Sequence, residues 1–229
     1  MNHRQGLIVF LLLFASVCAC SQTNFFHDFT LVKNFTSKNA KVAYFISPEW
    51  IHIYDDVTWE NISVSLQAKR LLGNWEAGGG LGTYYTVDES LSNNLELRPY
   101  LLLALKTPIT ESVLFTQTLK PELRTFMYSD QQYNSTTIRI RYALNLGYVF
   151  ARNETRSSSW QISPYTEWFV VKNSRVKERF VGSQTYKLTL YRNFKNNQSV
   201  GLAYKYEKFN RNFYADKPNG HTMRLEYNF

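Results

Sequence analysis

The stretch HTMRLEYNF, residues 221–229, indicates the fold of this chain, because apolar and polar side chains alternate along it. One set of alternate positions is apolar: Met223, Leu225, Tyr227 and Phe229. The positions between them are polar: Thr222, Arg224, Glu226 and Asn228. Side chains of a strand point alternately to its two faces, so this stretch predicts a strand with one apolar face and one charged face.

The same pattern recurs along the chain, and glycine or asparagine falls in the breaks between the alternating stretches. We expect strands near Phe25–Phe35, Lys41–Ile53, Ile62–Leu72, Trp75–Val87, Asn94–Leu105, Val113–Tyr128, Thr137–Phe150, Trp160–Val171, Thr185–Phe194, Val200–Phe209 and His221–Phe229. No stretch after residue 20 has the periodicity of a helix. The sequence therefore predicts an all-β protein, a closed antiparallel up-and-down β-barrel.

Alternation by itself leaves open which face of the strands points inward. A membrane barrel turns its apolar face out to lipid, and three features favour this arrangement. The expected strands reach the roughly 9–11 residues that cross a bilayer when tilted. They outnumber the roughly eight strands of a small soluble barrel. Aromatic residues make up 16% of the chain and concentrate near strand ends, where their rings prefer the boundary between lipid and water.

A closing strand that ends on an aromatic residue resembles the last strand of outer-membrane β-barrels. That resemblance implies that Met223, Leu225, Tyr227 and Phe229 form a signal read by the barrel-assembly machinery. The chain also resembles the small bacterial outer-membrane barrels of the domain of unknown function 2490 family. The resemblance rests on NFFHDFT at residues 24–30, on ELRPY at residues 96–100 and on the closing strand. The resemblance implies a location in the outer membrane of a Gram-negative bacterium, in contact with lipid and lipopolysaccharide, and implies no activity.

The sequence allows more than one number of strands. Eleven stretches alternate, whereas bacterial single-chain barrels use even numbers of strands. We therefore expect twelve strands, or ten if Phe25–Phe35 is not part of the wall. Short and long connections alternate between the strands, which is typical of barrels with short turns on the periplasmic side and longer loops outside.

The amino terminus has the three-part layout of a secretory signal: Arg4, the apolar run Leu7–Val17, and a region of small residues. We expect residues 1–20 to be a cleaved signal peptide and residues 21–229 to form a single barrel domain. The sequence Val17–Cys20 is an imperfect lipobox that makes Cys20 a candidate for lipidation. Ordinary cleavage near Ala19–Gln22 is the alternative.

Several classes of function are disfavoured by composition. Cys18 and Cys20 are the only cysteines, so the mature chain is expected to lack disulfides and thiolate metal sites. The formal net charge is +8, but the basic residues are scattered rather than clustered, which argues against nucleic acid as a partner. We expect no cofactor and no metal.

The polar faces of the strands are expected to enclose a charged lumen. Its charged residues are Lys69, Glu96, Arg98, Glu122, Arg124, Arg139, Arg141, Glu167, Lys187, Lys205, Glu207, Arg224 and Glu226, with Glu49 and Lys120 on the same faces. Several acidic and basic residues lie two positions apart and therefore share a face of one strand. Two interpretations follow. The charges either form an ion-pair network that braces the wall, as in a structural envelope protein, or line a narrow channel for small, anionic solutes.

Two further classes remain open. A lipid-modifying enzyme would need a histidine near a nucleophile, and the mature chain offers His27, His52 and His221. Neighbouring His27 and Asp28 point to opposite faces of a strand, and no Gly-x-Ser-x-Gly motif is present, so we assign no catalytic residue. A secreted soluble barrel that binds a small apolar ligand would need its apolar faces turned inward. The glycines in Gly78–Gly82 are expected to let the wall curve or to make room for bulky lumen side chains.

Overall fold

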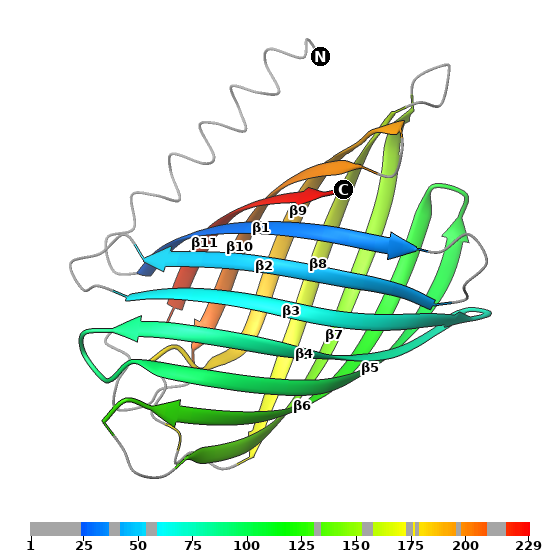
Figure 1. Ribbon diagram of the computed structural model, residues 1–229. Coiled ribbons are helices and arrows are strands. Elements are labelled where there is room, and N and C mark those ends of the chain that lie inside the picture. Colours follow the sequence, from blue (N-terminus) through cyan, green and yellow to red (C-terminus); the bar gives the residue numbers. More distant parts are fainter. Residues whose placement is uncertain are drawn as a thin grey trace.

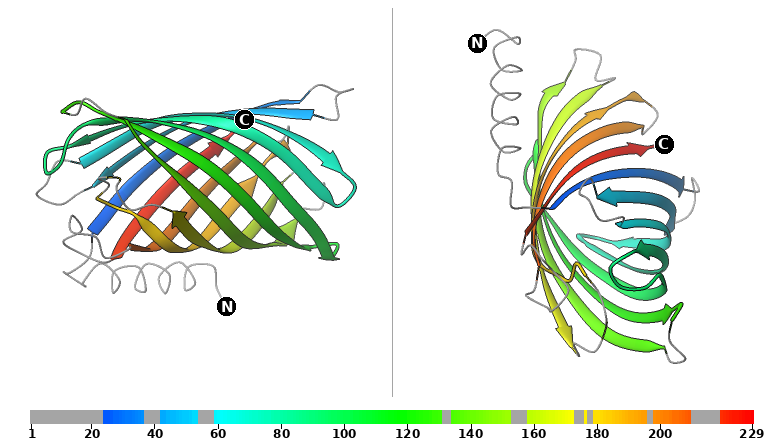
Figure 2. Two further views of the ribbon diagram at one scale, coloured as in Figure 1. Left: turned by 90° about the horizontal axis from the view of Figure 1, so that it is seen from below. Right: turned by 90° about the vertical axis from the view of Figure 1, so that its left-hand side faces the viewer.

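The computed structural model of the chain is a closed β-barrel with steeply tilted strands (Figures 1 and 2). The structure describes residues 24–36, 42–53, 59–130, 134–152, 158–172, 176, 179–195, 198–209 and 219–229. The expected signal peptide and Cys20 lie outside these residues. The described residues contain no helix of the length and apolar character needed to cross a membrane.

Each expected alternating stretch corresponds to one strand of the barrel. The strands are β1 (Asn24–Thr36), β2 (Val42–Ile53), β3 (Trp59–Leu72), β4 (Trp75–Asp88), β5 (Asn94–Thr110), β6 (Val113–Tyr128), β7 (Ser135–Arg152), β8 (Ser159–Lys172), β9 (Gly182–Asn193), β10 (Ser199–Phe209) and β11 (Asn219–Asn228). Strand β5 continues five residues past the expected end at Leu105 and includes Pro108. Pro108 lies at a shift in register with β6, where the missing backbone N–H of proline is tolerated.

Successive strands pair antiparallel around the barrel, and the ring closes where β1 pairs with β11. This last pair is parallel, with Asn24 opposite Gly220 and Val32 opposite Asn228. Within the described residues the barrel has eleven strands, so the expected twelve, and the alternative of ten, were wrong. The expectation of a fully antiparallel barrel was also wrong at this seam. In an up-and-down path with an odd number of strands, the first and last strands run in the same direction and can close the ring only as a parallel pair.

Connections of different length gather at the two ends of the barrel. The two-residue connections 73–74 and 111–112 lie at one end, together with the end of β11. The strand ends joined by the longest connections, 173–181 and 210–218, lie at the other end, together with the start of β1. Gly73 supplies the positive φ of 62° in the tight turn between β3 and β4.

The charged faces of the strands point into the barrel, and the apolar faces point outward. Arg124 and Glu122 on β6 are 1% and 2% exposed, whereas Leu101 on β5 and Val170 on β8 are each 67% exposed. Because the side-chain period of a strand is two, this orientation assigns every second residue of a strand to the interior.

Glycines on β4 make room for large side chains inside the barrel. Gly78, Gly80 and Gly82 face inward at alternate positions of the strand. A Cβ atom on Gly80 would lie 2.5 Å from the hydroxyl oxygen of Tyr100, and one on Gly82 would lie 2.5 Å from the ring of Tyr84. Of the two expected roles, room for bulky interior side chains is confirmed at Gly80 and Gly82, whereas a Cβ atom on Gly78 would meet the backbone of β3.

Replacing Gly80 with alanine should therefore destabilise the barrel. The new Cβ atom would collide with the backbone carbonyl oxygen of Leu66 and with the Tyr100 hydroxyl. We expect Gly80→Ala to lower the free energy of unfolding by about 1–3 kcal/mol, as overpacking generally does. Urea unfolding in lipid vesicles, followed by tryptophan fluorescence, measures the change.

Gly147→Ala is the matched control for this substitution. Its Cβ atom would first meet the side-chain amide of Gln161 at 3.0 Å, and that amide can rotate away. If both variants lost the same stability, the proposed fit between Gly80 and Tyr100 would be contradicted.

Candidate functional site: the charged interior

The structure places the charged residues singled out in the sequence on the inward face of the wall. Six of them are buried: Glu96, Arg98, Glu122, Arg124, Arg139 and Glu167. The others are partly buried: Lys69, Arg141, Lys187, Lys205, Glu207, Arg224 and Glu226. They do not form one ring of charge, because they separate into clusters on different parts of the wall.

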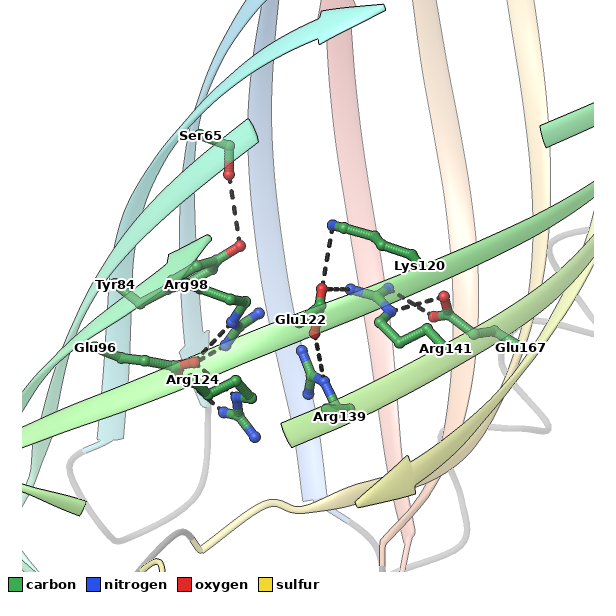
Figure 3. Close-up of polar contacts among 10 residues, drawn as sticks. All are labelled: Ser65, Tyr84, Glu96, Arg98, Lys120, Glu122, Arg124, Arg139, Arg141 and Glu167. Atoms are coloured by element: carbon green, nitrogen blue, oxygen red, sulfur yellow. Dashed lines mark hydrogen bonds and ion pairs between the residues drawn. The ribbon is translucent and has the colours of Figure 1, made fainter. Parts of the chain in front are cut away.

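The largest cluster spans β5 to β8 and is called the arginine cluster here (Figure 3). It contains five basic residues and three acidic ones: Arg98, Lys120, Arg124, Arg139, Arg141, Glu96, Glu122 and Glu167. Glu96 receives hydrogen bonds from two arginines. The Nε atoms of Arg98 and Arg124 each donate to Glu96 Oε1 at 2.7 Å, and their Nη2 atoms donate to Oε2 at 2.7 and 2.9 Å. Such fork-shaped pairs combine charge with fixed geometry.

Glu122 is the centre of the second half of the arginine cluster. Arg139 donates to its Oε2 at 2.6 Å, and Arg141 donates to its Oε1 at 3.2 Å. Lys120 lies 3.2 Å from the same Oε1 atom. Arg141 also binds both oxygens of Glu167 at 2.7 and 2.8 Å. These contacts tie β6, β7 and β8 together across the inner wall.

A second cluster lies at the seam and is called the carboxylate cluster here. Arg224 of β11 contacts Glu49 of β2 at 2.9 Å and Asp28 of β1 at 3.1 Å. Its Nε atom lies 3.5 Å from Glu226. Thr30 donates a hydrogen bond to Asp28 at 2.9 Å. One arginine therefore links the three strands on either side of the closure and faces three carboxylates.

The two clusters give the lumen an uneven distribution of charge. In a ring of eleven strands, β6 and β7 lie opposite β1. The arginine cluster therefore faces the carboxylate cluster across the lumen. The first has five basic and three acidic groups, whereas in the second a single arginine contacts three carboxylates.

Aromatic rings pack under several of the cations. The guanidinium of Arg98 lies 3.8 Å from the ring centroid of Tyr84, and the ammonium of Lys120 lies 3.7 Å from that of Tyr100. Arg141 lies 5.2 Å from the ring of Phe169. Cation–π contacts of this kind hold the charged heads against the wall.

A cavity of about 290 Å³ lies between the two clusters. Among the described residues, seven basic and five acidic side chains line it: Arg98, Arg139, Arg141, Arg179, Lys187, Lys205, Arg224, Glu49, Asp88, Glu96, Glu167 and Glu207. At the end with the longest connections its lining includes the aromatic group formed by Phe26, Trp59, Phe180 and Phe209. The cavity is thus polar along the wall and apolar at one end.

Sequence reasoning did not include Asp28, Tyr84, Tyr100 or Tyr165 in the lumen. Asp28 was considered only beside His27, although Asp28 shares a strand face with buried Asn24, Phe26 and Thr30. The alternation of β1 was a signal that could have assigned it. Nothing in the sequence showed that Asp28 would contact Arg224, because 196 positions separate the two residues.

The histidines lie on the outer side of the wall. His27 is directly opposite His52 across the β1–β2 pair, and His221 is hydrogen-bonded to Tyr204. Asp28 points inward, so it does not orient His27. Ser63 and Ser163 are buried in the interior, where they donate to Glu49 and Asn145. Among the described residues, no group of three or more histidine, cysteine or acidic side chains is placed to hold a metal ion.

The expected assembly-signal residues lie along the outer side of β11 and at its end. Leu225 and Phe229 are exposed, and the ring of Tyr227 stacks on that of Phe229 at 5.3 Å. The backbone N–H of Phe229 donates to the carbonyl of Val32, and Lys33 lies over its ring at 4.4 Å. The end of the chain is therefore bound to β1 rather than projecting from the wall.

The chain matches no protein-family model, and no curated protein matches it.

Removing the charge of Glu122 should be much more damaging than removing that of Glu76. The Glu122→Gln substitution would leave Arg139, Arg141 and Lys120 without their shared carboxylate in the interior. We expect a loss of about 3–5 kcal/mol in the free energy of unfolding, as for other broken buried ion pairs. Urea unfolding in lipid vesicles measures this loss.

Glu76→Gln serves as the comparison, because Glu76 also contacts more than one basic residue but is more accessible. It pairs with Lys69 at 3.4 Å and with Lys106 at 2.6 Å, and both lysine side chains are at least one quarter exposed. We expect a loss of about 0–1 kcal/mol there. Equal losses at the two sites would show that Glu122 has no special role in bracing the wall.

Proposed function

We propose that this chain is a small transmembrane β-barrel of the outer membrane of a Gram-negative bacterium, and that its lumen passes small hydrophilic solutes with a preference for anions. The observation that carries the proposal is the orientation of the wall, with apolar side chains outside and ion-paired charges inside. A lipid bilayer stabilises this arrangement, because apolar side chains on the outside contact hydrocarbon. Closure of the barrel also leaves no unpaired backbone edge in the hydrocarbon.

The outer surface supports the membrane location. Large apolar side chains are exposed along most strands, including Phe29, Leu66, Leu101, Ile140, Val170, Leu188 and Leu225. Continuous apolar surface of this extent is rare on soluble monomers. A secreted soluble barrel that carries an apolar ligand would require the reverse arrangement, with such residues converging inside.

The lumen supports the passage of solutes. Eight strands are just enough for side chains to fill a barrel, and eleven strands enclose a wider interior. A cavity remains between the charged clusters, and its basic side chains outnumber its acidic ones. Arginine and lysine side chains that line a pore favour anions.

A structural envelope protein is the second candidate, and the ion-pair network favours it. Glu96, Glu122 and Arg224 each join neighbouring strands, and the aromatic group beside Phe26 narrows one end of the cavity. A network that blocks the lumen would leave a rigid barrel without transport. Conductance separates these two functions.

The surroundings of the histidines give no support to a lipid-modifying enzyme. His27 and Asp28 lie on opposite faces of β1, and Ser63 points into the lumen. We also propose that the partners of the barrel are lipid, lipopolysaccharide and the barrel-assembly machinery. The family that we propose for the chain is the domain of unknown function 2490 family, which it resembles.

An arginine in the middle of the outer wall tests the membrane location. Leu101 is exposed near the middle of β5, and we expect Leu101→Arg to cost about 2–4 kcal/mol in a bilayer, because the charge would enter hydrocarbon. Ile109→Arg near the end of the same strand should cost about 0–1 kcal/mol. Unfolding in lipid vesicles measures both values. In a water-exposed wall, neither variant would lose more than about 0.5 kcal/mol, and this result would contradict the membrane location.

Planar-bilayer recording tests the passage of solutes. We expect the purified, folded barrel to give discrete current steps in potassium chloride. In a potassium chloride gradient the sign of the reversal potential should show selectivity for chloride over potassium, because the cavity carries an excess of basic groups. Folding is checked beforehand by the altered mobility of the unheated protein in gel electrophoresis. Folded protein that inserts without current would identify a structural barrel instead.

A further inference from the structure

We propose that the lumen contains a binding site for a small oxyanion, the carboxylate or phosphate group of a solute, centred on Lys187 and Lys205. The inference deepens the proposed passage of anions and rests on it for its biological meaning. The site itself is argued from strand register, ion pairing and the cavity.

Strand register places the two lysines directly opposite each other. Lys187 of β9 is the cross-strand partner of Lys205 of β10, and both line the cavity. Cross-strand neighbours have Cβ atoms about 4.5–5.5 Å apart, and like charges at this spacing repel each other. Lys120 and Arg141 are also like-charged cross-strand neighbours, but Glu122 contacts both of them. No carboxylate of the described residues is shared in this way by Lys187 and Lys205.

Among the described residues, only one of the two lysines has an ion-pair partner. Lys205 lies 3.2 Å from Glu207. For Lys187, no carboxylate of the described residues lies within ion-pairing distance, and its ammonium lies 4.7 Å from the ring centroid of Tyr165. Three other lumen lysines, Lys69, Lys106 and Lys120, each have a glutamate partner. Lys187 therefore contributes a positive charge that the described part of the wall does not pair.

The cavity provides the space for an anion beside this charge. It is lined by Lys187, Lys205, Arg141, Arg224 and Tyr165, among others. Arg141 and Arg224 already bind carboxylates of the wall, so they add positive potential rather than free donors. The Lys187 ammonium has three N–H donors and no carboxylate to receive them among the described residues. At about 290 Å³ the cavity is just below the usual range for small-molecule sites, which limits the ligand to a small solute.

The test is a titration of the full barrel in detergent with inorganic phosphate, and in parallel with acetate, followed by calorimetry. We expect saturable binding of at least one of the two anions, and the tighter one indicates the class of solute. Lys187→Gln should weaken binding at least about tenfold, because it removes charge-assisted hydrogen bonds. Lys187→Arg should retain binding within about threefold, since it keeps the charge and the donors.

Lys106→Gln is the matched control. It also removes one positive charge from the lumen, but Glu76 keeps its second partner, Lys69. We expect anion binding to remain within about twofold of the unchanged protein, because this lysine lies outside the cavity lining.

A stability measurement guards against a misfolded variant. Without anion, Lys187→Gln should unfold at the same or a higher urea concentration than the unchanged protein, because it relieves a repulsion. Adding phosphate or acetate, whichever binds, should then raise the stability of the unchanged protein and not that of the variant.

Two results would overturn the inference: no saturable binding of either anion by the unchanged barrel, or equal binding by the unchanged protein and Lys187→Gln. These results are distinct from a failure of the proposed function. A barrel that conducts without saturable binding keeps its transport role and loses this site. A barrel that binds the anion without conducting keeps the site and loses the transport role.

Discussion

Closure of the sheet between β1 and β11 is the constraint on which the rest of the structure depends. The pair runs in register from Asn24 opposite Gly220 to Val32 opposite Asn228 and gives the two terminal strands hydrogen-bonded neighbours on both sides. A closed ladder leaves no open edge, so the wall can present apolar side chains on its whole outer surface. Closure also defines an inside, where the charged residues at inward positions meet one another.

Those partners come from other strands, and they make the interior a connected system. Glu96 joins β5 to β6, Glu122 joins β6 to β7, and Glu167 binds Arg141 across β7 and β8. At the seam Arg224 joins β11 to β1 and β2. Buried charges are expensive unless they are paired and hydrogen-bonded, so the arrangement stabilises only the closed, correctly registered barrel. Ion pairing in the interior and hydrogen bonding at the seam therefore depend on each other.

The interior is not uniformly paired, and the exceptions suggest function. The arginine cluster and the carboxylate cluster face each other, and the cavity lies between them. The adjacent lysines at positions 187 and 205 lack a shared carboxylate of the kind that Glu122 provides for Lys120 and Arg141, and Lys187 has no carboxylate partner among the described residues. Bracing of the wall and binding of anions can coexist. Bracing depends on the residues in ion pairs, whereas anion binding depends on the basic residue that has no acidic partner among the described residues.

Local periodicity was enough to determine much of this protein from its sequence. The alternation of Thr137–Phe150 or His221–Phe229 showed where strands form and which residues share a face, because a strand repeats every two residues whatever lies beside it. It also grouped the charges that line the interior, and the glycines of β4 that leave room for Tyr100. The tertiary structure alone decided how the ring closes and which charges meet. The parallel β1–β11 seam, the contact of Asp28 with Arg224, and the pairing of Lys187 with Lys205 rather than with an acid all depend on register between strands. Register is set by the closed ladder as a whole, and a pattern confined to one strand does not contain it.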